Sequence, residues 1–156
     1  MSTSALIPRI ASAFPTEPVP QPGDILYNEE TTYKGSFPVD SELAEIKSFF
    51  GNRRWDLVTP QDVFQFRHAL SFFSKSALAY YTAAWMTCAL LDDEAVDTAI
   101  ENLVSKLGKA NPNLWTQEQR QVICEWLIHF NVSDLPSSKH DFENAANNMR
   151  CSQPRV

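Results

Sequence analysis

Apolar residues recur every three or four positions along most of the chain, which is the spacing of an amphipathic α-helix. The clearest case is Asp92–Leu107, where Ile100, Leu103 and Leu107 share one face and Gly108 follows as a stop. Similar patterns predict helices over Ser4–Phe14, from Asp40 or Ser41 to Phe50, over Thr116–Phe130 and over Ser138–Met149. No segment alternates for long enough to predict a strand ladder. The pattern therefore predicts an all-α fold of five to seven helices.

Another helix is predicted to begin at Thr59-Pro60. Threonine caps helix ends, proline suits the first helical position, and Asp62 places a carboxylate in the first turn. The predicted inward face of this helix is Val63, Phe64, Phe66, Leu70 and Phe73. Ahead of it, Trp55 and Leu57 are expected to fill the core beneath the connection.

The segment from Ser76 to Leu91 carries no charged residue. Its 16 residues are fewer than the roughly 20 that a bilayer-spanning helix needs. A helix that is apolar on all sides is instead expected to be covered by neighbouring helices. We therefore predict that Ser76–Leu91 is the central helix of a bundle.

Prolines gather in an N-terminal arm, Pro15–Pro38, which is predicted to be irregular. Within it, the apolar run Asp24–Tyr27 is expected to attach the arm to the body as a short extended piece. The length of 156 residues suits one core, so residues 1–150 are predicted to form a single helical domain that includes the arm. Residues 151–156 form a polar tail.

The net charge of −6 bears on the class of partner. An acidic surface repels phosphate backbones and anionic bilayers, and the basic residues do not cluster beyond the pair Arg53-Arg54. We therefore expect neither a nucleic acid nor a membrane as partner. A protein with a basic surface would be attracted instead.

Three cysteines, Cys88, Cys124 and Cys151, stand far apart without a C-x-x-C motif. An odd number at such spacing fits a reducing compartment. Cys88 and Cys124 lie in apolar helical patterns and are expected to behave as small buried hydrophobes. Pro8 and Arg9 interrupt the apolar stretch that a secretory signal would need, so the expected location is the cytoplasm.

Three carboxylates, Asp93, Asp97 and Glu101, stand one turn apart on one helix face. Like charges at this spacing destabilise a helix by a few tenths of a kcal/mol per pair. Three interpretations remain open, namely a solvated helix start, a surface complementary to a basic partner, and a metal site. The metal site is least favoured, because one helix face supplies too few oxygen ligands.

The arm offers a second candidate surface in Tyr27, Glu29, Glu30 and Tyr33. They follow the proline run Pro18–Pro22, which favours an extended polyproline II conformation. Tyrosine and glutamate on an extended arm suit contact with a basic protein. The alternative is a plain tether without a binding role.

No catalytic signature is present in the sequence. Four glycines form no phosphate-binding loop, so no nucleotide cofactor is expected, and no other cofactor or metal is indicated. A small hydrolase that uses His68 or His129 remains a minor alternative, because triads assemble in space. Another alternative is a regulatory or scaffold domain that binds through an apolar groove, with Trp55 or Trp115 as a half-exposed anchor.

The order of aromatic residues carries a resemblance. It runs through Phe49–Gly51, Trp55–Leu57, Leu70–Ser74, Tyr80-Tyr81 and Ala84–Met86. This order resembles a small bacterial all-helical family of unknown function, over roughly residues 5 to 130. That family usually has a proline after the tyrosine pair, where this chain has Thr82. In size, acidity and helical make-up the chain is also similar to the class of immunity proteins, which neutralise bacterial toxins.

Together these features predict a cytoplasmic binding protein without enzymatic activity. The favoured form is an immunity protein that occludes the active site of its cognate toxin through an acidic surface. The predicted contact residues are Asp93, Asp97 and Glu101 on the helix and Tyr27, Glu29, Glu30 and Tyr33 on the arm.

Overall fold

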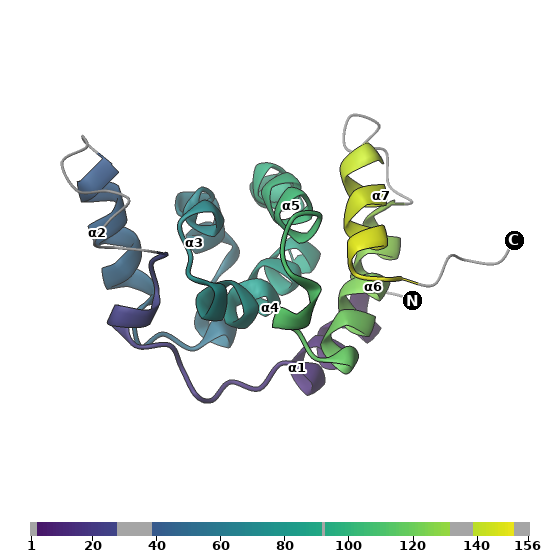
Figure 1. Cartoon of the computed structure of the whole chain (residues 1–156), viewed down its shortest axis with the longest axis horizontal. Coiled ribbons are helices and arrows are strands. Elements are labelled where there is room, and N and C mark those ends of the chain that lie inside the picture. Colours follow the sequence, from purple (N-terminus) through teal and green to yellow (C-terminus); the bar gives the residue numbers. More distant parts are fainter. Residues whose placement is uncertain (1–2, 28–38, 92, 132–138, 152–156) are drawn as a thin grey trace, which may run out of the picture.

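A computed structural model describes residues 3–27, 39–91, 93–131 and 139–151. Seven α-helices and no strand occur in this described part, which confirms the predicted all-α fold (Figure 1). The helices are α1 (Thr3–Ala13), α2 (Val39–Phe50), α3 (Pro60–Gln65), α4 (Lys75–Leu91), α5 (Asp93–Leu107), α6 (Gln117–Asn131) and α7 (Lys139–Asn148). Short 3-10 turns connect them, namely η1 (Pro22–Asp24), η2 (Trp55–Leu57), η3 (Ala69–Ser71) and η4 (Pro112–Leu114).

Helix α4 lies at the centre, as predicted, and its one charged residue is Lys75 at the first position. It contacts α1, α3 and α5, and ten of its residues are buried on all sides of the helix. Ser74 caps it, because the Ser74 hydroxyl accepts a hydrogen bond from the backbone N–H of Ala77 at 3.1 Å. The one buried polar residue of this helix, Thr82, donates its hydroxyl proton to the carbonyl of Leu78 at 2.6 Å. Among the described residues, no helix is long and apolar enough to cross a membrane.

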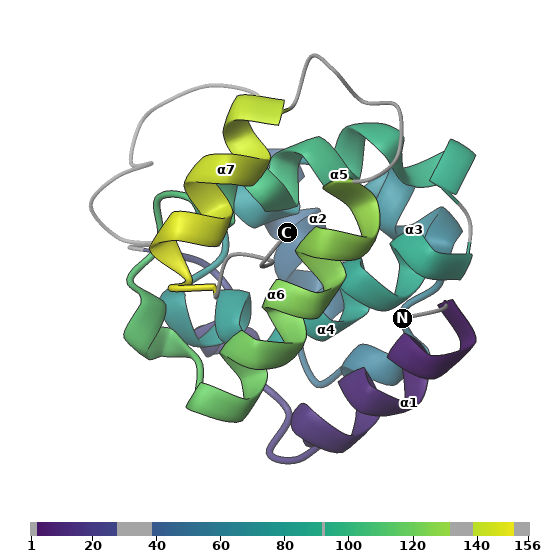
Figure 2. The same cartoon turned by 90° about the vertical axis from the view of Figure 1, so that its right-hand side faces the viewer.

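The first helix lies beside the sixth, far away in the sequence. Figure 2 shows α1 at the lower edge next to α6, and the two helices are in contact. Arg9 on α1 forms a two-pronged ion pair with Glu125 on α6, with nitrogen–oxygen distances of 2.6 and 2.8 Å. The pair is partly exposed, so its contribution to stability is small. The buried side chains of α1 provide most of this attachment.

Aromatic rings pack against the middle of α4. Phe50, at the end of α2, packs against Phe73, Tyr81 and Trp85 with ring centroids 5.0–5.9 Å apart. The Tyr81 hydroxyl donates to the backbone carbonyls of Phe50 and Arg53. The aromatic cluster therefore ties α2 and the loop after it to the central helix.

The predicted burial of two residues in the core is wrong. Phe64 is 49% exposed and Leu57 is 59% exposed. The prediction assumed one helical phase from Pro60 to Phe73, but α3 ends at Gln65, where Phe66 leaves the helical conformation. Within α3 the buried side is that of Val63, and Phe64, about 100° further round the helix, faces outward with the Arg67 guanidinium 5.0 Å from its ring centroid.

Trp55 and Trp115 are both buried, which confirms that Trp55 fills the core and speaks against the alternative of a half-exposed tryptophan anchor. Trp115 is 2% exposed and Trp55 is 4% exposed. The indole N–H of Trp55 donates to the backbone carbonyl of Phe14 at 3.1 Å, which ties η2 to the end of α1. These side chains stabilise the core and are not available to anchor a partner.

The cysteines differ in part from the prediction. Cys124 on α6 forms a disulfide with Cys151, with 5.5 Å between the Cα atoms, so Cys124 is not a free buried thiol and the predicted polar tail begins at a cross-linked residue. Cys88 is buried and free, as expected. Burial raises the pKa of its thiol to about 12. The disulfide removes the cysteine argument for a reducing compartment, and the cytoplasmic location stays a prediction.

Candidate functional site

The first half of the arm is attached to the body by hydrogen bonds that its backbone carbonyls accept. The Tyr80 hydroxyl donates to the carbonyl of Thr16 at 2.7 Å. Further along, the N–H of Asn52 donates to the carbonyl of Pro20 at 2.9 Å. Carbonyl groups of the arm make both contacts, and at Pro20 the carbonyl is the only backbone group that can do so, because proline has no N–H. Residues 15–21 are therefore a strap laid across the fold.

The second half of the arm is attached at the segment that the apolar run predicted. Ser74 donates its N–H to the carbonyl of Ile25 at 2.8 Å, and Tyr27 donates its N–H to the carbonyl of Phe72 at 2.9 Å. Ile25 is fully buried, and Leu26 forms an isolated antiparallel bridge. The predicted attachment at Asp24–Tyr27 is confirmed, but the predicted extended conformation is found only at Leu26, because Asp24 ends η1 and Ile25 has helical backbone angles.

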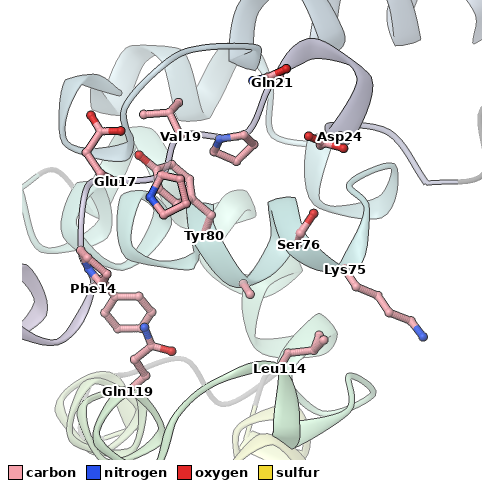
Figure 3. A pocket seen from close by; sticks show the side chains of 14 residues that line it. Phe14, Glu17, Val19, Gln21, Asp24, Lys75, Ser76, Tyr80, Leu114 and Gln119 are labelled. Atoms are coloured by element: carbon pink, nitrogen blue, oxygen red, sulfur yellow. The ribbon is translucent and has the colours of Figure 1, made fainter.

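An open groove of about 740 Å³ lies between this strap and the body. Figure 3 shows Tyr80 at its centre, next to the strap. The lining side chains come from the strap and the residues at its two ends (Phe14, Pro15, Glu17, Pro18, Val19, Pro20, Gln21 and Asp24), from α4 (Lys75, Ser76, Ala79 and Tyr80), from η4 (Leu114) and from α6 (Gln119). We call this the strap groove.

The strap groove is apolar inside and charged at its ends. Eight of the fourteen lining residues are apolar or aromatic, including three prolines. Glu17 lies at one end of the view in Figure 3, and Asp24 and Lys75 lie at the other. Both carboxylates are exposed, so they keep their hydration until a partner arrives. The groove therefore combines apolar contact area with two carboxylates against one ammonium group.

Tyr80 contributes its ring to the groove, and its hydroxyl is already engaged. The oxygen accepts the N–H of Trp55 at 3.1 Å while the proton goes to the carbonyl of Thr16. Partial burial is the main cause that raises the pKa of this phenol, with smaller effects from nearby charges. A neutral phenol whose hydroxyl makes two hydrogen bonds suits a structural role and not proton transfer at neutral pH.

The predicted acidic face of α5 is present in part. Asp97 and Glu101 are exposed on this helix, one turn apart. Asp93 begins the helix, and its side chain lies outside the described ones. The structure therefore confirms the placement of two of the three carboxylates on the surface of one helix.

Of the predicted contact residues of the arm, the structure describes only Tyr27. This side chain is 49% exposed. Glu29, Glu30 and Tyr33 lie outside the described residues. In Figure 1 and Figure 2, residues 15–24 follow the lower edge of the molecule and α5 lies in its upper half. The strap groove and the acidic face of α5 are thus separate surfaces.

The residues considered for chemistry lie apart. His68 is exposed just before η3, whereas His129 is on α6 with its ring 5.0 Å from that of Phe130. Cys88, the buried thiol, donates to the carbonyl of Val58 at 3.4 Å and stays protonated at neutral pH. In the described part of the chain, no group of three or more histidine, cysteine, aspartate or glutamate side chains is placed to hold a metal ion.

Comparison with known families gives one match. A family model described as "Family of unknown function (DUF6714)" matches residues 2–148. The chain belongs to this family. The match covers the strap, the groove and all seven helices, so these features lie within the region that defines the DUF6714 domain. No curated protein and no solved structure matches the sequence.

Membership of DUF6714 agrees with the predicted resemblance to a family of unknown function. The family description names no activity, so the similarity to immunity proteins stays a prediction. Where a proline was expected after Tyr80-Tyr81, Thr82 continues α4 as one helix to Leu91.

Sequence reasoning missed the strap groove as a whole. Its lining comes from four segments of the chain, and the contacts between them have no local signature. The available signal was Pro18–Pro22, which indicated an extended strap but not the surface that it would face.

Proposed function

We propose that this member of DUF6714 is a binding protein that holds an extended, positively charged segment of a partner protein in the strap groove. The observation that supports the proposal is the groove itself, a long apolar surface with carboxylates at both ends. Extended segments lie well against proline and aromatic surfaces, where they bury apolar area with little loss of conformational entropy.

Charge favours a basic segment. Two of the three charged groups at the groove, Glu17 and Asp24, are negative, and the chain carries a net charge of −6. The exposed carboxylates Asp97 and Glu101 add to this field from the other edge. Opposite charge raises the rate of association more than it raises the final affinity.

We propose further that the partner is a bacterial toxin and that binding blocks its active site, as in immunity proteins, within the cytoplasm. The support is the acidity, small size and helical fold of the chain. The partner to test is a protein encoded by the neighbouring gene, above all one with a variable C-terminal toxin domain. Rescue of growth on co-expression would support this form of the proposal.

Binding in the groove is tested by reversing the charge at its two carboxylates. The variant Glu17→Lys/Asp24→Lys is expected to weaken the affinity for the basic partner by about tenfold or more, because each lysine repels a cationic side chain. Affinity is measured by calorimetry at low and high salt. The matched control is Glu42→Lys/Glu45→Lys on α2, which changes the net charge equally at two exposed positions away from the groove. An equal loss of affinity in both variants would show only a general effect of net charge and would contradict binding in the groove.

The acidic face of α5 is tested in the same assay. Replacing Asp93, Asp97 and Glu101 together with lysine is expected to weaken protection against the toxin by about tenfold or more, mainly through a slower association rate. Stopped-flow measurement of the association rate over a salt series checks this expectation. An unchanged rate would remove α5 from the binding surface.

The competing function is a regulatory or scaffold domain with an uncharged partner. The apolar lining of the strap groove favours it, although Trp55 and Trp115 are not its anchors. Such a partner would bind with little dependence on salt. The variant Ala79→Arg, which places a bulky charge inside the groove, would weaken an uncharged partner strongly and leave a partner on α5 unaffected.

A further inference from the structure

The disulfide opens onto a second surface pocket. Cys124 and Cys151 are both half-buried and both line an open pocket of about 640 Å³. The other lining residues are Gln117, Arg120, Gln121, Glu125, Ile128, Met149 and Arg150. A pocket of this size admits a small thiol compound to the sulfur atoms. Disulfides that are reachable from solvent are the ones that exchange readily.

The charges at this pocket favour exchange. Two arginines, Arg120 and Arg150, line it together with the two cysteines. The Arg120 guanidinium also donates to the backbone carbonyls of Pro112 and Trp115, so Arg150 is the cation to test. The carboxylate in the same lining, Glu125, is paired with Arg9. Nearby cations stabilise a thiolate, which is both the attacking and the leaving species in thiol–disulfide exchange.

Helix α7 has attachments that do not depend on the disulfide. Asn148 donates its side-chain N–H groups to the backbone carbonyls of Leu107 and Ala110, both at 2.7 Å. Phe142 and Ala145 are buried against the rest of the core. Opening the bond would therefore loosen only the turn at Arg150 and Cys151, whose N–H groups donate to the carbonyls of Asn147 and Ala146, while α7 stays folded on α5 and α6 (Figure 2).

We propose that Cys124 and Cys151 form a reversible thiol–disulfide exchange site, opened by small dithiols and closed by oxidised glutathione. A thiolate of the dithiol attacks one sulfur, the S–S bond breaks, and the displaced sulfur leaves as a thiolate that takes up a proton. The second thiol of the reductant then attacks the mixed disulfide and releases the other cysteine. The protein gains two electrons and two protons, and the dithiol becomes a disulfide. The free thiol Cys88 takes no part, because it is buried and protonated.

The site is tested on the full, folded chain without any partner, so its failure and the failure of the proposed binding function are distinguishable. Oxidised protein is incubated with dithiothreitol, and new thiols are alkylated and located by mass spectrometry. We expect two alkylated residues, Cys124 and Cys151, and an unmodified Cys88 until the protein is unfolded. Oxidised glutathione should restore the bond. Hydrogen exchange should rise after Met149 and remain slow in α7.

A charge variant tests the role of the pocket. Arg150→Glu is expected to slow reduction by about threefold or more, because the leaving thiolate loses a neighbouring cation. Lys109→Glu is the matched control, since it makes the same charge change at an exposed residue outside the pocket lining. Three results would overturn the proposal: a bond reduced only after unfolding, alkylation of Cys88 in the folded protein, or cysteines that stay reduced with oxidised glutathione.

Discussion

Phe50→Ala is expected to lower the free energy of unfolding by about 3–5 kcal/mol, the usual range for removing a buried aromatic ring. Phe50 is fully buried and packs against Phe49, Phe66, Phe73, Tyr81 and Trp85. No single neighbour can fill the space, because those rings come from four different segments. Urea unfolding monitored by circular dichroism measures the loss.

The same substitution at an exposed ring is the control. Phe64→Ala removes an equal number of atoms from a side chain that is 49% exposed, on the short helix α3. Its expected cost is about 1 kcal/mol or less. Similar losses at both positions would mean that the ring cluster around Phe50 is not the centre of the core.

Gly51→Ala is expected to lower the free energy of unfolding by about 1–3 kcal/mol and to loosen the strap. A Cβ atom at Gly51 would lie 2.7 Å from Cγ of Pro22, 2.9 Å from its Cα and 2.9 Å from the carbonyl oxygen of Lys47. Two of these atoms belong to the backbone, so the strap must move away. The amide of Asn52, which donates to Pro20, should then exchange its hydrogen faster.

Gly23→Ala is the matched control for the strap. It lies one residue beyond Pro22, and a Cβ atom there would have no neighbour within 4 Å. The expected change in the free energy of unfolding is about 0.5 kcal/mol or less. The affinity for the partner should follow the same order: Gly51→Ala should lower it and Gly23→Ala should leave it unchanged. Protection of Asn52 that survives in Gly51→Ala would contradict the close contact between strap and body.

Helix positions were predictable because their signals are local. Thr59 and Asp62 form a capping box at the start of α3, where the sequence Thr-Pro-Gln-Asp predicts it. Thr116 and Gln119 make the same reciprocal hydrogen bonds before α6. Each signal depends on residues within one helical turn, so it can be read without knowledge of the fold.

Predictions failed where the helical phase broke or where distant residues met. The short helix α3 buries Val63 and leaves Phe64 outside, and the pairing of Cys124 with Cys151 bridges 27 positions. The acidic residues were placed on the surface correctly at Asp97 and Glu101 because exposure follows from helical spacing.

The sequence alone determined an all-α domain with a central helix that is free of charge over Ser76–Leu91 and a proline-rich strap attached at Asp24–Tyr27. Hydrophobic spacing, caps and prolines act on neighbouring residues, and these properties depend on nothing else. The tertiary structure alone decided the contact between α1 and α6, the disulfide pocket, and the strap groove around Tyr80. Each depends on packing between segments that are far apart along the chain, and loop closure leaves no local pattern in the residues that it brings together.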